Sequence, residues 1–227
     1  MSTYFTSELF DFLEELSLNN NREWFNANKH RYLNHVQEPA LAFINDFRPR
    51  LAKIAPHFVA DPRAQGGSLY RIYRDTRFSK DKTPYKTNSG VHFRHEASKD
   101  AHAPGFYLHL DPDGCFAGFG LWRPEPAVAQ QVRQAIVDSP AIWKKAAHAK
   151  TFTDRWNQEG DSLVRPPKGF DPGHPFIEDI KRKDFVAGGS IPEKQVTGPG
   201  FINEFAAMCR SAVPYMKFLC SAVGVPY

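Results

Sequence analysis

The chain contains few cysteines and no long apolar run. Its three cysteines are too few for a disulfide framework. Cys209 and Cys220 fall in a stretch predicted to be helical, where their spacing places them about 16 Å apart, well beyond the ~7 Å limit on Cα separation for a disulfide. No segment approaches the ~18–20 apolar residues of a membrane span. We therefore expect reduced, mostly buried thiols and no membrane-spanning segment.

Secretion signals and common catalytic motifs are also missing. The first residues do not form a basic segment followed by an apolar one, so we expect a cytoplasmic protein. There is no Gly-x-Ser-x-Gly, Cys–His or Walker pattern. Ser79 and Lys82 resemble a nucleophile pair only in spacing, because a solvated, cation-rich loop does not lower the pKa of a lysine. Whether the protein uses a cofactor is not indicated by the sequence.

Histidines are present, but their spacing does not favour a metal site. On a strand, His92 and His95 point to opposite faces, and no cysteine pair has ligand spacing. His102 and His109 follow at larger distances along the chain. We expect no metal centre.

Helical periodicity dominates the first quarter of the chain. Apolar residues recur at helical spacing over residues 5–16. Asn20 followed by Glu23 resembles a capping box that starts a second helix. Pro39 suits the first turn of a third helix, in which Pro49 is expected to cause a kink or a split.

The pattern then changes to the alternation of β-strands. Residues 68–74, 91–94, 106–110 and 115–122 alternate between apolar and polar, and Asp-Pro-Asp-Gly at 111–114 is a strong turn signal. Because no helical segment separates these strands, the sheet should be mainly antiparallel.

The second half returns to helices. We predict helices beyond Pro126, long surface connections over 151–174, a short helix within 175–183 and a strand over 185–191. The sequence therefore predicts an α+β fold with a mainly antiparallel sheet packed by helices. A single domain over 1–227 would comprise a helical part (5–55), a sheet-rich part (58–122), a helical and irregular part (125–198) and a closing helix (201–223).

Charge is concentrated in one place. The chain carries a formal net charge of +4, but residues 71–94 hold seven basic and two acidic side chains and the remainder is slightly acidic. Arginine forks grip phosphate or carboxylate, and lysines and hydroxyls add further donors. We name residues 71–86 the basic segment and expect it to bind a phosphate-bearing or other anionic small ligand through Arg71, Arg74, Arg77, Ser79, Lys80, Lys82, Tyr85 and Lys86.

Other interpretations of the basic segment stay open. Asp75 and Asp81 could pair with neighbouring cations and organise a long loop. In an enzyme acting on a phosphorylated or nucleotide substrate, one of them would be a base or metal ligand, free of an arginine partner. A noncatalytic module would present the segment to an acidic protein surface. Aromatic residues between the cations suit a nucleotide or a short single strand, but not a duplex. The sequence does not indicate the oligomeric state.

Two further features bear on a ligand site. The polar helix start near residue 20 would form one pocket with the basic segment if the two pack together, with Trp24 and Tyr32 as walls. Gly118 and Gly120 share one strand face, which is unfavourable in a strand unless something approaches closely. We favour filling of that space by Trp122 or a packed helix over a ligand.

The chain also resembles a widespread microbial family, catalogued as domain of unknown function 2461. The long motif RIYRDTRFSKDKTPYKT at 71–87 makes the resemblance specific. Relatives are expected to be richer in glycine around residues 118–120. The resemblance implies no activity, ligand or catalytic residue. Further motifs that resemble the family lie at 12–32, 104–114, 120–126, 165–175 and 181–185.

Overall fold

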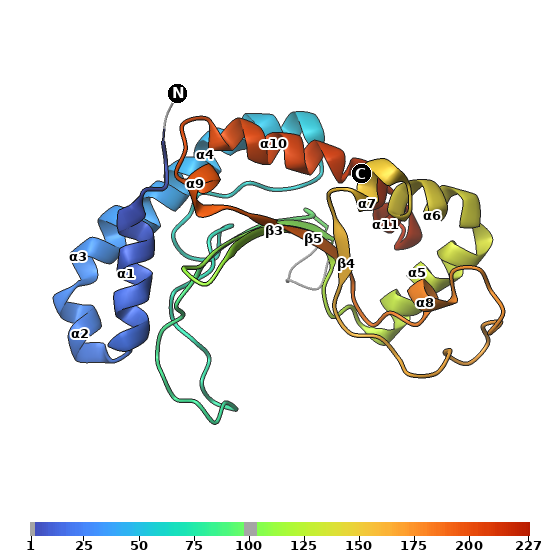
Figure 1. The fold of residues 1–227 in the computed structure, drawn as a ribbon, viewed down its shortest axis with the longest axis horizontal. Coiled ribbons are helices and arrows are strands. Elements are labelled where there is room, and N and C mark those ends of the chain that lie inside the picture. Colours follow the sequence, from blue (N-terminus) through green and yellow to red (C-terminus); the bar gives the residue numbers. More distant parts are fainter. Residues whose placement is uncertain (1–2, 98–103) are drawn as a thin grey trace.

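The structure, a computed structural model, describes residues 3–97 and 104–227. The described chain forms helices and one antiparallel sheet (Figure 1), which confirms the predicted α+β class. His102 lies outside the described residues. The helices of the first part of the chain are α1 (Ser7–Leu18), α2 (Arg22–Ala27), α3 (Lys29–Arg31), the π-helical turn η1 (Tyr32–Gln37) and α4 (Glu38–Ile54). The later helices are α5 (Pro126–Asp138), α6 (Pro140–Ala147), α7 (Lys150–Thr153), α8 (Ile177–Ile180), α9 (Glu193–Val196), α10 (Phe201–Ser211) and α11 (Val213–Ala222).

The sheet has five strands in the order β1-β2-β3-β5-β4, and all neighbours are antiparallel. The Asp111–Gly114 turn joins β2 to β3, as its sequence predicts, with the Gly114 N–H donating to the Asp111 carbonyl. The short edge strand β4 was not predicted, because three polar residues carry no periodicity. The strands are β1 (Ser89–Arg94), β2 (Gly105–Leu110), β3 (Cys115–Leu121), β4 (Asn157–Glu159) and β5 (Phe185–Ile191).

The two faces of the sheet differ. Helices α4 and α10 lie along one face (Figure 1), and strand side chains such as Phe93, Leu108 and Phe119 are buried there. We call the other side the open face, because no helix of the described chain packs across it. Strand residues that point to it, such as His92 and Tyr107, are half-buried. Alternation along the strands therefore separates an apolar core from a polar and aromatic surface.

Prolines decide how two of the helices run. Helix α4 begins with Pro39 in its first turn, as predicted, and continues through Pro49 without a split. The predicted closing helix is instead two helices, because Pro214 begins α11 in its first turn and cannot donate to the preceding turn. The three cysteines are buried, and none of them is joined in a disulfide. None of the helices within 3–97 and 104–227 is long and apolar enough to cross a membrane.

The strand predicted over residues 68–74 does not form. This stretch divides its backbone hydrogen bonds between two partners. Tyr70 N–H donates to the Gly90 carbonyl of β1, whereas Arg74 N–H donates to the Pro84 carbonyl. Only isolated bridges result, at Leu69 and at Tyr73. The alternation was correct, but the partner changes after two or three residues, so neither ladder is long enough to make a strand.

Candidate functional site

The basic segment leaves the edge of the sheet next to β1, turns and comes back. Its residues 74–83, which we call the tip, project away from the sheet on the side opposite α4 and α10 (Figure 1). Arg71 and Lys86 lie where the segment leaves and rejoins the sheet, and we call these two residues the base. The Lys86 N–H donates to the Ile72 carbonyl, which closes the excursion.

The two arginines of the tip are neutralised within the tip. Arg77 donates to Asp75 at 2.7 Å, and Arg74 forms an ion pair with Asp81 and also contacts Thr83. These arginine hydrogen bonds lower the pKa of both aspartates to about 2. Neither carboxylate is free of an arginine, so the condition set for an enzyme using Asp75 or Asp81 is not met.

The remaining predicted residues of the segment play different parts. Lys82 donates to the Thr76 carbonyl at 2.8 Å, and Lys80 is exposed at the tip without a partner in the described chain. Ser79 donates its backbone N–H to the Thr76 carbonyl. Tyr85 is only 3% exposed and stacks on Phe25 with ring centroids 4.0 Å apart. Tyr85 is therefore a core residue.

Cations of the base are not neutralised. The Lys86 ammonium lies 5.1 Å from the centre of the Tyr70 ring, and no described carboxylate pairs with it or with Arg71. Burial, together with the charge of Arg71, lowers the pKa of Lys86. The charge of Arg71 contributes to the low pKa of Asp75, but that carboxylate hydrogen-bonds Arg77. Because Arg71 and Lys86 repel each other and form no ion pair in the described chain, this is a point on the molecule at which an anion is favoured.

Beside the base, five rings gather on the open face. This ring cluster has two hydrogen-bonded pairs, Tyr70 with His92 at 3.1 Å and Tyr107 with His109 at 3.0 Å. Burial lowers the pKa of His92 to about 4 and raises the pKa of Tyr107, so both rings are neutral at pH 7. The members of the ring cluster, each in contact with at least one other, are Tyr70, His92, Tyr107, His109 and Phe116.

Glycines allow two of these rings to lean across neighbouring strands. A Cβ atom at Gly90 would come within 2.5 Å of the Tyr107 hydroxyl, and one at Gly105 within 2.1 Å of His92 Nε2. The rings therefore occupy space that only glycine leaves free. Gly120 is required for a different reason, because its φ of 123° and the nearby Phe185 carbonyl leave no room for a side chain.

Gly118 lies in the same face, and the described fold does not require a glycine there. The nearest described atoms to a Cβ at this position are 3.7 Å away, which is ordinary contact. Trp122, which we expected to fill the space, is half exposed and is not among those atoms. No atom of a described helix is among them either, because the nearest atoms belong to the Ala187 carbonyl and the Phe116 ring. In the described chain, the expected filling by Trp122 or a helix is therefore not found.

The first helices pack beside the basic segment, which was the condition for a pocket shared by the two. Asn20 receives the Tyr85 N–H and donates to the Tyr85 carbonyl, both at about 3 Å. This corrects the predicted capping role, since Asn21 caps α2 by accepting from the Trp24 N–H. Trp24 packs against the Phe12 ring.

Tyr32, the second expected wall of that pocket, is buried between Phe12 and Phe25. Aromatic rings therefore fill the junction between the first helices and the basic segment. That condition is met, but Tyr32 belongs to the core and does not line a pocket.

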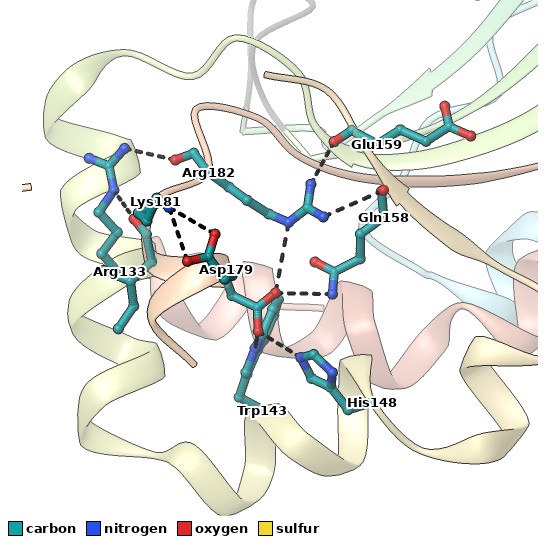
Figure 2. Close-up of polar contacts among 10 residues, drawn as sticks. Arg133, Trp143, His148, Gln158, Glu159, Asp179, Lys181 and Arg182 are labelled. Atoms are coloured by element: carbon teal, nitrogen blue, oxygen red, sulfur yellow. Dashed lines mark hydrogen bonds and ion pairs between the residues drawn. The ribbon is translucent and has the colours of Figure 1, made fainter. Parts of the chain in front are cut away.

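A second polar cluster ties the far edge of the sheet to the helices (Figure 2). The buried Asp179 carboxylate accepts from Trp143, His148 and Gln158, at 2.8, 2.6 and 3.2 Å. Arg133 donates to the Ile180 and Arg182 carbonyls. These contacts join α5, α6, α8 and β4, so the cluster is a structural connection. No sequence signal marks it, because its members are far apart along the chain.

The predicted histidines separate as expected. His95 is buried and contacts the Pro226 carbonyl at 2.7 Å, whereas His92 and His109 face the open side. No three His, Cys, Asp or Glu side chains of residues 3–97 and 104–227 are grouped to hold a metal ion. The alternation of β1 and β2 had already placed His92 and Tyr107 on polar faces. The missed signal was the pair of glycines, Gly90 and Gly105, beside those rings.

Comparison with known proteins identifies the family. Residues 8–218 match the family described as conserved hypothetical protein, DUF2461. The chain belongs to the DUF2461 family. The match confirms the resemblance seen in the long motif of the basic segment and covers nearly the whole chain. No curated protein and no solved structure matches.

Proposed function

We propose that this DUF2461 protein binds a phosphate-bearing small ligand at the base of the basic segment. The observation that carries the proposal is the arrangement of Arg71 and Lys86, two cations without a carboxylate partner in the described chain, next to the open face. The charge of Arg94 also acts on His92 and Tyr70 from β1. Arg71 and Lys86 thus bring positive charge to the edge of the ring cluster.

The contrast with the tip supports this location. Arg74 and Arg77 already have carboxylate partners, and a ligand phosphate would have to displace them. A phosphate at the base displaces no protein anion and relieves the repulsion between Arg71 and Lys86. Half-burial of Lys86 also strengthens its attraction for a charge, because water screens it less than at the exposed tip.

Calorimetric titration with ribose 5-phosphate tests the proposal, with Lys86→Met and its matched control Lys80→Met. Both substitutions remove one lysine charge, but Lys80 lies at the tip. We expect Lys86→Met to weaken binding about 10- to 100-fold, as for the loss of one charged hydrogen bond, and Lys80→Met to leave it unchanged. Equal affinities in both variants, or no binding by the unmodified protein, would overturn the proposal.

A further inference from the structure

The open face beside the phosphate-binding base offers aromatic surface. The Lys86 ammonium is 5.1 Å from the Tyr70 ring centre, and the Tyr70 and Tyr107 ring centres are 6.1 Å apart. These two distances together place the ammonium within one nucleotide's length of the Tyr107 ring. A ligand that reaches from the base across the open face therefore meets Tyr107.

Beyond Tyr107, the next two positions of this row of the sheet are glycines. Gly118 lies directly opposite Tyr107 on β3, and Gly188 lies opposite Gly118 on β5. Gly118 has room for an added atom, so the described packing does not explain its lack of a side chain. The row thus has the half-buried Tyr107 ring, which leans toward Gly90 of β1, at one end and two glycines next to it, with the Phe116 ring 3.7 Å from the Cβ position of Gly118. This arrangement suits a flat group lying on the sheet among aromatic rings.

The rings that border this surface are neutral, and charges lie at its margins. His92 and Tyr107 carry no charge at neutral pH, while Lys86 and Arg71 lie toward the β1 edge. On the other side, the Glu159 carboxylate lies over Gly188, 3.4 Å from where its Cβ would be, without a hydrogen-bond partner in the described chain. A flat ligand group here would be neutral, with N–H donors suited to a carboxylate.

We infer that the ligand is a nucleotide, whose nucleobase lies over Gly118 against the Tyr107 ring and whose phosphate is held by Arg71 and Lys86. Nucleobases are flat, neutral and stack on aromatic side chains, and guanine, adenine and cytosine carry amino donors for Glu159. The inference rests on the proposed function for the phosphate site and adds a site for the nucleobase. The same chemistry is offered by a free nucleotide and by a short single strand.

Calorimetric titrations test the inference by comparing the affinities of AMP, GMP, CMP and UMP with that of ribose 5-phosphate, which has the phosphate but no nucleobase. We expect at least one nucleotide to bind the unmodified protein about 5- to 150-fold more tightly than ribose 5-phosphate, as for one base–aromatic stack. A single-stranded RNA ten-mer forms a further arm. A ten-mer that binds more tightly than every mononucleotide identifies a strand as the source, and the reverse identifies the free nucleotide.

Three variants test where the nucleobase binds. Gly118→Val fills the surface, and Tyr107→Leu removes the ring; both should reduce nucleotide affinity to that of ribose 5-phosphate. Tyr107→Phe keeps the ring and should bind as the unmodified protein does. Circular dichroism and thermal melts verify folding of each variant, and the two disruptive variants alter different strands, so the result does not depend on one of them folding.

The outcomes separate the two proposals. If ribose 5-phosphate binds through Lys86 but no nucleotide binds more tightly, the inference about the nucleobase fails and the proposed function stands. If nucleotides bind more tightly but Gly118→Val and Tyr107→Leu leave that difference in affinity unchanged, the nucleobase binds elsewhere and the inference also fails. If neither ribose 5-phosphate nor a nucleotide binds, both proposals fail.

Discussion

The tip and the base of the basic segment contain the same kinds of cation but place them in opposite surroundings. Arg74 and Arg77 lie within hydrogen-bond distance of Asp81 and Asp75, so both arginines of the tip are already paired, and its remaining positive charge is that of the exposed Lys80 and Lys82. Arg71 and Lys86 have no such partner in the described chain, and Lys86 is half-buried against an aromatic ring. Counting charges along the chain would treat all four alike. Whether a basic residue can hold a ligand depends on what already neutralises it.

The largest expected change in folding stability concerns His92, a ring of the cluster that burial keeps neutral at pH 7. Burial lowers the pKa of His92 to about 4, from an ordinary value of 6.5. Between these values the unfolded chain binds a proton at His92 and the folded chain does not. Lowering the pH from about 6.5 to 4 should therefore cost about 3 kcal/mol of folding stability through this residue.

Urea unfolding of the wild type and of His92→Gln across this pH range checks the prediction. The groups around His92 are Tyr70, Tyr107 and Arg94, and burial raises the pKa of both tyrosines, so neither tyrosine changes its charge in this range. The stability difference between the two proteins should shrink or reverse as the pH falls. A constant difference from pH 7 to 4 would mean that His92 is not held neutral.

Glycines of the open face give the next largest effect. Gly90→Ala would force the Tyr107 ring away from β1 and should lower the free energy of unfolding by about 1–3 kcal/mol, as overpacking does. Gly118→Ala has room for the added methyl group and should be neutral or slightly stabilising. Chemical denaturation of the two variants measures the contrast. Equal losses of unfolding free energy in the two variants would show that packing requires Gly118. That result would contradict the proposed nucleobase surface.

The tip should give the smallest effect. Asp75→Asn and Asp81→Asn each remove an exposed ion pair, and such pairs contribute little to stability. We expect thermal melts at pH 7 to change little. Because the pKa of each aspartate is depressed to about 2 from 3.8, any stabilisation is present above pH 3.8 and is lost as the pH falls toward 2. A large fall in Tm at pH 7 would show that the tip contributes to the folded core.

The arrangement of helices and strands was largely predictable, because it follows from where apolar residues repeat. Phe93, Leu108 and Phe119 mark the covered face of the sheet by simple alternation. The stretch over 68–74 alternates equally well but changes its hydrogen-bond partner from β1 to residue 84. Periodicity describes which way side chains point and not which backbone lies alongside, so this part could not be predicted.

The candidate site was predictable in position but not in its parts. Net charge located the basic segment, yet the pairing of Arg74 with Asp81 depends on how the loop turns back. Tyr85 looked like a ligand contact because it lies between cations, but Phe25 from α2 covers it. The role of Tyr107 depends on Gly90, which lies on a neighbouring strand. Such contacts between distant residues are set by the folded chain.

Two double variants with equal loss of charge test the central claim most directly. Arg71→Met with Lys86→Met removes the base, whereas Arg74→Met with Arg77→Met removes the arginines of the tip. Calorimetric titration with ribose 5-phosphate should show affinity lost in the first and retained within about twofold in the second. Affinity retained without the base, or lost without the tip arginines, would contradict the account.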